Sequence, residues 1–208
     1  MEFLILATLI VVGASILKST DQRRRIALLG SHLGHYQIEK LMENLTEGYL
    51  RCLGENDAAR RAQIWGVLEE TERTLASQFE NFAAEFARVD GRETRVSKLP
   101  FSIPYTHLFL PAATFDLRKA FAIHARGITE VMRNSEHRAP KARAYMMTAE
   151  LFLMQHTCHW YCKSKMVASA RLLARHKTAY QQVIDAVSPG TAATTWRSPV
   201  SDWAAAAA

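Results

Sequence analysis

An uncharged run of residues from Phe3 to Leu17 constrains the folding of this chain more than any other feature. It is dense in leucine, isoleucine and valine. A bilayer is spanned by about 20 apolar residues, with a lower limit near 17. Met1 and a snorkelling Lys18 extend the run to that limit. We therefore expect residues 1–18 to form a transmembrane anchor.

A cleaved signal peptide is the alternative, since its apolar core is about 7–15 residues long. It would also need a positive N-terminal region, and the only early charge here is Glu2. The positive residues follow the run: Lys18, Arg23, Arg24 and Arg25. Because a flank rich in Lys and Arg stays in the cytoplasm, we expect an uncleaved single-pass anchor in a bacterial-type inner membrane. Its N-terminus would lie outside and the rest of the chain in the cytoplasm.

The composition favours helices, because alanine, leucine, glutamate and arginine are plentiful and the chain has only 9 Gly and 6 Pro. Its three cysteines are Cys52, Cys158 and Cys162, an odd count that fits a reducing compartment better than a disulfide framework. The net charge of +6 is compatible with anionic lipid or nucleic acid as a partner and does not decide between them.

Apolar residues spaced by three and four predict amphipathic helices over residues 21–53, 58–88, 115–134 and 140–187. We expect Asp57 or Asn56 to cap the second of these helices and Pro140 to open the fourth. The predicted fold is all-α: a transmembrane helix followed by an antiparallel bundle of about four helices, the last of them long. The domains would be the anchor (1–18), the bundle (19–187) and a flexible tail (188–208).

The loop over residues 97–115 is unusual, because it carries no formal charge from Leu99 onward and is broken by three prolines. Loops are normally polar. This loop either covers one end of the bundle or contacts the membrane or a membrane-embedded partner. In the second case the contact residues would be Phe101, Tyr105, Phe109 and Phe115.

Basic residues late in the fourth predicted helix offer a second membrane contact. If that helix returns toward the anchor, Arg171, Arg175 and Lys177 would join the three arginines at 23–25 near anionic lipid head groups. A solvated helix face is the alternative interpretation.

The stretch HTCHWYC at 156–162 suggests a metal site. On a helix, Cys158, His159 and Cys162 share a face, whereas His156 points elsewhere. Counting residues along the helices places His35 at a similar depth as a fourth ligand. A metal or haem could bind this set, and ordinary packing of buried cysteines is the alternative.

No arrangement of residues typical of a catalytic site is recognisable in the sequence, so we expect a protein that is not an enzyme and has no cofactor. The leading hypothesis is a structural or interaction subunit of a larger inner-membrane assembly. Its partners would be the bilayer, other membrane proteins and a second copy of the chain. One alternative is a membrane-tethered metal or haem sensor, and another is a lipid- or nucleic-acid-binding regulator. The anchor and the lack of a recognition helix argue against nucleic acid.

Overall fold

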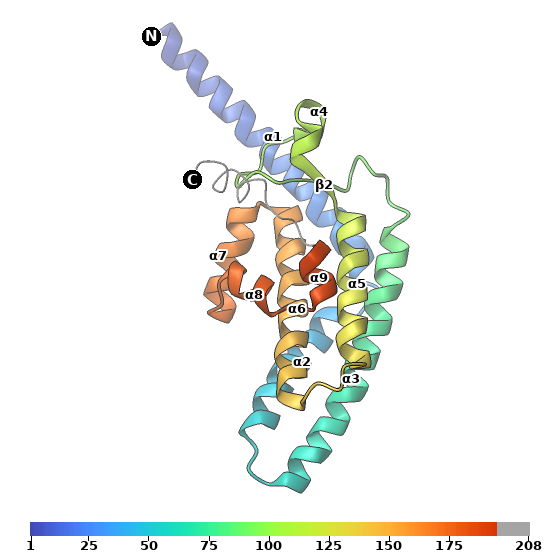
Figure 1. Cartoon of the computed structure of the whole chain (residues 1–208). Helices are drawn as coiled ribbons and strands as arrows, with labels where there is room; N and C mark the ends of the chain where they lie inside the picture. The colour runs from blue at the N-terminus through green and yellow to red at the C-terminus, as the bar shows by residue number, and fades with distance from the viewer. Residues whose placement is uncertain (195–208) are drawn as a thin grey trace, which may run out of the picture.

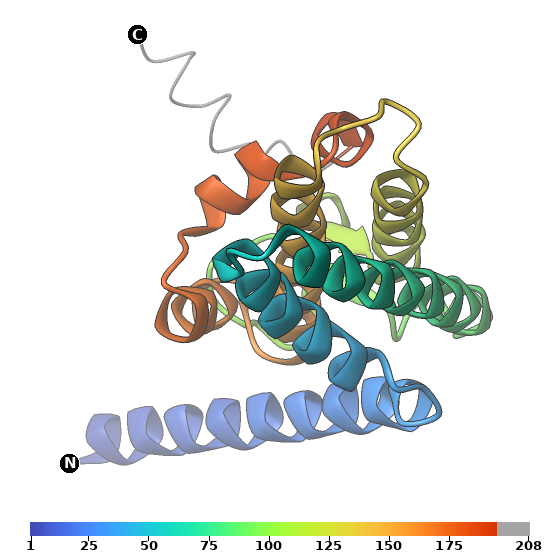
Figure 2. The same cartoon turned by 90° about the horizontal axis from the view of Figure 1, so that it is seen from below.

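The computed structural model describes residues 1–194, and in this range the chain folds into α-helices with two three-residue strands (Figure 1). The all-α fold class is therefore confirmed. The helices form an elongated body, and the N-terminal half of the first helix projects from one end of it (Figure 1). Viewed from below, this helix runs along one side of the body (Figure 2).

The first helix, α1 (Glu2–Leu33), contains the predicted anchor and continues into the body without a break. It ends at Gly34, and a short turn leads into α2 (Ile38–Gly54). The prediction of one continuous helix over residues 21–53 is therefore wrong, because the chain turns between α1 and α2. Glycine disfavours helix because it loses the most conformational freedom there. The turn also lets α2 place its apolar stripe of Met42, Leu45 and Tyr49 in the core.

The third helix, α3 (Ala58–Phe86), runs back beside α2 (Figure 1). It begins as predicted at Asp57, whose carboxylate accepts a hydrogen bond of 2.9 Å from the amide of Arg60. The helix α5 (Leu117–Arg133) packs on α3 through an aromatic cluster. Phe121 lies with its ring centroid 5.1 Å from that of Phe82 and 5.1 Å from that of Phe86. The residues of α5 spaced by three and four form a buried seam: Leu117, Phe121, His124, Ile128 and Val131.

Two short strands close the loop between α3 and α5. β1 (Arg95–Ser97) pairs antiparallel with β2 (Thr114–Asp116), with Val96 opposite Phe115. Between them lie the single-turn helix α4 (Thr106–Phe109) and a 3₁₀ turn, η1 (Pro111–Ala113). The proline-rich segment therefore forms an ordered loop, and the pairing of β1 with β2 holds its two ends together.

The long helix predicted over 140–187 is instead three helices: α6 (Pro140–Cys162), α7 (Lys165–His176) and α8 (Tyr180–Ala186). Lys163 leaves helical geometry, and Ser164 caps α7 by accepting the amide of Val167 at 3.3 Å. Lys177 then ends α7 in the left-handed region, with φ of 53°. The break lets α7 and α8 fold back on α6 and bury a second small cluster of side chains: Ala149, Leu153, Leu172, Val183 and Val187.

The predicted tail from 188 starts too early. Residues Pro189–Thr194 form a further short helix, α9, which packs on α5. Ser188 and Thr191 are buried, and the buried carboxylate of Glu150 accepts the amide of Ser188 at 2.9 Å. The remaining part of the predicted tail, 195–208, lies outside the described residues.

Candidate functional site

The projecting part of α1 is the clearest functional feature. An 18-residue window of this helix has a mean hydropathy of 2.0, and none of the window is buried. It is the single helix within residues 1–194 that is long and apolar enough to cross a membrane. Large apolar side chains such as Phe3, Ile10 and Val11 are more than half exposed along it. In water this surface would be costly, at about 25 cal/mol for each Å² of apolar area.

The arginines that follow the apolar run of α1 have different environments. Arg25 is built into the body: its guanidinium pairs with Asp21 at 2.9 Å and donates to the carbonyl of Arg95 at 3.2 Å. The same group lies 5.3 Å from the ring centroid of Tyr161. Arg24 pairs with Glu93 on the surface. Of the residues predicted to contact anionic lipid, Arg25 therefore holds α1 on the body instead.

The loop between β1 and β2 exposes most of its large apolar side chains. We call six of them the apolar cap; they are Phe101, Ile103, Tyr105, Leu108, Phe109 and Leu110. Phe109 is 78% exposed. The loop stands out from the same end of the body from which α1 projects (Figure 1).

Phe115, the fourth aromatic predicted for this contact surface, is not part of it. It is 6% exposed, and its ring meets that of Trp160 edge-on with centroids 5.0 Å apart. Phe115 lies in β2 rather than in the loop, and its side chain points into the core. The prediction for this residue was wrong because the charge pattern of the sequence does not reveal where the short strand begins.

The basic residues of α7 run away from the anchor end. α6 returns to that end at Cys162, and α7 then leads away from it (Figure 1). Arg175 lies ten residues beyond Lys165, a rise of about 15 Å. That exceeds the Debye length of about 8 Å at physiological ionic strength. Arg175 and Lys177 therefore lie too far from the end from which α1 projects to make the predicted lipid contact there, and Arg171 is only partway along.

The residues of the cluster at 156–162 do not all lie on one side of α6. Cys158 and His159 both line a groove toward α2, and His159 also accepts a hydrogen bond from Arg171 of α7 at 3.2 Å. His156 is buried against α7 and α8, with its Nε2 3.0 Å from the hydroxyl of Ser169. Burial lowers the pKa of His156 to about 3, so the ring is neutral.

His35 is not brought to this cluster. It lies in the turn after α1 with its side chain 70% exposed, and its Nδ1 is 3.8 Å from a carboxylate oxygen of Glu85. The depth argument failed because α1 ends at Leu33, so His35 is not inside a helix. Within residues 1–194, no group of three or more His, Cys, Asp or Glu side chains could hold a metal ion.

The thiols of Cys158 and Cys162 are poor metal ligands, because burial keeps them protonated. Burial raises the pKa of the Cys158 thiol, and the neighbouring Cys162 and Glu39 raise it further. Burial also raises the pKa of Cys162 to about 11. Since the thiolate is the metal-binding and nucleophilic form, both cysteines behave chiefly as packing residues.

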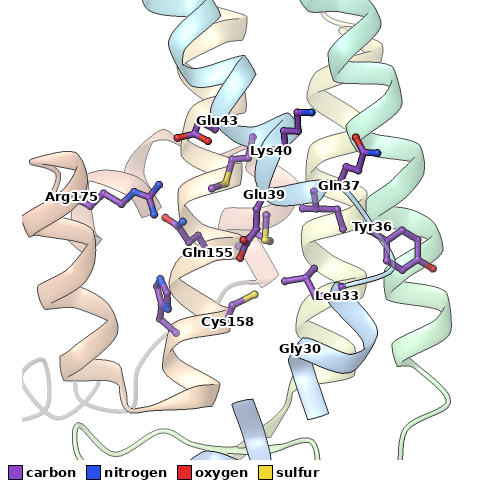
Figure 3. A pocket seen from close by; sticks show the side chains of 15 residues that line it. Gly30, Leu33, Tyr36, Gln37, Glu39, Lys40, Glu43, Gln155, Cys158 and Arg175 are labelled. Carbon is purple, nitrogen blue, oxygen red and sulfur yellow. The ribbon is translucent and has the colours of Figure 1, made fainter. Parts of the chain in front are cut away.

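A groove of about 710 Å³ lies between the C-terminal end of α1, the start of α2, and α6 (Figure 3). Its floor is apolar, with Leu33, Ile38 and Met154. Charged and amide side chains of α2, α6 and α7 also line the groove, as Figure 3 shows: Glu39, Lys40, Glu43, Gln155 and Arg175. An apolar floor with a polar rim is typical of a surface that binds another molecule.

The sequence did not predict a buried ion pair that joins α3 to α6. Glu72, which the helical pattern places on the charged face of α3, is fully buried and paired with Arg143 of α6. The hydroxyl of Tyr49 donates to the same carboxylate at 2.5 Å, and Arg143 also reaches Glu69 at 3.0 Å. No local signal predicts this network, because its members come from three helices.

The fold and the exposed N-terminal helix define an α-helical body carried on one helix that is able to cross a membrane. No family model matches the chain, and neither curated proteins nor solved structures give a significant match. The function is therefore inferred from the chain's own residues.

Proposed function

We propose that this chain is a single-pass membrane protein whose helical body serves as an interaction subunit of a larger assembly in a bacterial-type inner membrane. The observation that carries the proposal is the projecting half of α1. Its side chains are apolar over a length that fits a bilayer, and none of the window is covered by the body. A helix with no protein cover needs another apolar environment, and lipid supplies one.

The proposed orientation places the N-terminus outside and the body in the cytoplasm. Lys18, Arg23 and Arg24 follow the apolar run, whereas Glu2 is the only charged side chain before it. This asymmetry supports the orientation through the positive-inside rule. Three free cysteines are in keeping with a reducing compartment.

One surface supports a role in interaction with another protein. The groove beside α2 offers an apolar floor with a charged rim. Exposed apolar patches on a folded domain commonly mark binding sites.

Membrane integration is tested by carbonate extraction of membranes that contain the full chain. We expect the protein to stay in the pellet, with an intact N-terminus by mass spectrometry. The double variant Leu9→Asp/Val12→Asp should move to the soluble fraction, since a carboxylate at the bilayer centre costs about 3 kcal/mol. A soluble wild-type chain, or one cleaved near residue 18, would contradict the anchor.

The subunit role is tested by isolating the protein in a mild detergent and identifying what co-purifies. We expect integral membrane proteins in fixed stoichiometry. Lys40→Glu, on the rim of the groove, should reduce their recovery. Lys119→Glu provides the control, because Lys119 is exposed on α5 and does not line the groove. A chain that purifies alone as a monomer from native membranes would count against a subunit role.

A further inference from the structure

We infer that the apolar cap is a second membrane contact, which inserts its side chains into the lipid interface beside the transmembrane helix. This inference rests on the proposed membrane anchor and goes beyond it, because it commits the cap to lipid rather than to a protein partner. It is carried by the height of the cap relative to the membrane boundary, by its side chains and by its charge.

The position of the apolar cap relative to the membrane boundary follows from how α1 joins the body. Lys18 is the first charged residue after the apolar run and therefore marks the lipid boundary. Only four residues later, the side-chain oxygen of Gln22 accepts a hydrogen bond of 3.1 Å from the ammonium group of Lys163. Four helical residues rise about 6 Å. The head-group layer is also about 5–8 Å thick on each side of the hydrocarbon core, so this end of the body lies at the head groups.

The base of the cap is fixed to the same corner. The amide of Met166, at the start of α7, donates to the carbonyl of Pro100 at 3.2 Å. The indole of Trp160 donates to the carbonyl of Ser97 at 2.8 Å. The loop from Phe101 onward therefore starts at head-group level and stands out further from that end of the body (Figure 1).

The side chains at the tip are those that favour the interface. Twelve large apolar side chains are exposed in residues 34–194, and six of them are the apolar cap, within ten consecutive residues. Met166, 53% exposed, adds another at the same corner. Such a concentration of uncovered apolar area is uncommon on a surface that faces only water.

The charge pattern also suits lipid. No aspartate or glutamate occurs between Glu93 and Asp116, whereas Arg95 and Lys98 lie at the base of the loop. Apolar side chains with cations behind them and no carboxylates are typical of segments that lie in an anionic membrane interface.

The single turn of α4 at the tip of the loop is suited to a partly dry environment, because its backbone groups form hydrogen bonds within the turn. The amide of Leu110 donates to the carbonyl of Thr106 at 2.8 Å, and the hydroxyl of Thr106 donates to that of Ile103 at 2.6 Å. Unpaired backbone groups would oppose insertion.

Photo-crosslinking of the full chain in vesicles of phosphatidylethanolamine and phosphatidylglycerol tests the inference. The photoreactive residue p-benzoylphenylalanine is placed in separate variants at Phe109, at Ile10 in the anchor, and at Leu50 near the opposite end of the body. Leu50 is the matched control, because its 75% exposure is close to the 78% of Phe109. After illumination, adducts are identified by intact mass and peptide mapping.

We expect lipid adducts at positions 10 and 109, with at least a tenfold lower yield at position 50. Lipid at position 10 but none at 109 overturns the inference and leaves the anchor standing. Crosslinking of position 109 to a second copy of the chain, or to another protein in native membranes, also overturns it. A failure to form lipid adducts at position 10 removes the proposed anchor itself.

Discussion

The buried carboxylate of Glu72 is paired with the guanidinium of Arg143, which lies 71 positions later in the chain. This pair joins α3 to α6, and the hydroxyl of Tyr49 connects α2 to the same carboxylate. The guanidinium also lies 5.9 Å from the ring centroid of Trp65. One ion pair thus connects three helices at the end of the body opposite the anchor.

Arg143→Ala should destabilise the body by about 3–5 kcal/mol, because it leaves a buried charge without a partner. The free energy of unfolding, measured with urea in detergent, checks this. The double variant Glu72→Gln/Arg143→Met should lose less stability than Arg143→Ala, since it removes both charges. Arg73→Ala, which breaks an exposed pair with Glu70, is the control and should cost less than about 1 kcal/mol. Equal losses for Arg143→Ala and the control would refute the role of the pair.

Gly127→Ala should destabilise the contact between α5 and α9. A Cβ at this position would lie 2.2 Å from the hydroxyl oxygen of Thr191 and 2.6 Å from a carboxylate oxygen of Glu150. Overpacking of this kind costs about 1–3 kcal/mol. We also expect faster hydrogen exchange over residues 188–194.

Gly66→Ala is the matched control for that substitution. It also replaces a helical glycine, but nothing lies within 4 Å of the added Cβ. Higher helix propensity should then stabilise the body by up to about 1 kcal/mol. If both variants were stabilised, α9 would not be packed as described.

The parts of the fold that depend on local pattern could be predicted from the sequence. The seam of α5 repeats at three and four residues, and Asp57 and Pro140 are residues that favour the starts of helices. The uncharged run in α1 was equally clear, because apolar length alone decides whether a helix can span a bilayer.

The parts that depend on tertiary contacts could not be predicted. The break after Cys162 arises because α7 packs back on α6, and the apolar spacing that predicted one helix over 140–187 gave no sign of it. Glu72 resembles its solvated neighbours in sequence, since the partner that permits its burial is on another helix. For the candidate site, the uncharged loop was predictable, whereas the burial of Phe115 depends on pairing with β1.

The stability of the body should fall as the pH is lowered from about 6.5 to 5. Burial lowers the pKa of His124 to about 3, and that of His156 likewise to about 3, against 6.5 in an unfolded chain. Between those values the unfolded state binds more protons, so protonation favours unfolding. Each histidine should contribute a slope of up to about 1.4 kcal/mol per pH unit.

His124→Gln should reduce the slope of stability against pH by the contribution of one histidine. The glutamine can still form a hydrogen bond with Thr157. His137→Asn is the control, because His137 is exposed and asparagine tolerates its left-handed φ of 52°. Urea titrations at a series of pH values measure the slopes. The same slope in wild type and His124→Gln would show that His124 does not stay neutral in the folded state.

Arg25→Lys should weaken the attachment of α1 to the body without changing the orientation of the anchor. Lysine keeps the positive charge that the positive-inside rule counts. However, a single ammonium group cannot reproduce the guanidinium, which pairs with Asp21 through Nε and donates to the carbonyls of Arg95 and Tyr161 through Nη1. We expect the free energy of local opening of α1 to fall by about 1–3 kcal/mol, the size of lost hydrogen bonds from a charged group. This is seen as faster hydrogen exchange over residues 21–33 in nanodiscs, while a C-terminal topology reporter stays cytoplasmic. Arg24→Lys, at an exposed surface pair, should leave both readouts unchanged. Unchanged exchange in Arg25→Lys would mean that α1 is held on the body by Leu29 and its apolar neighbours alone.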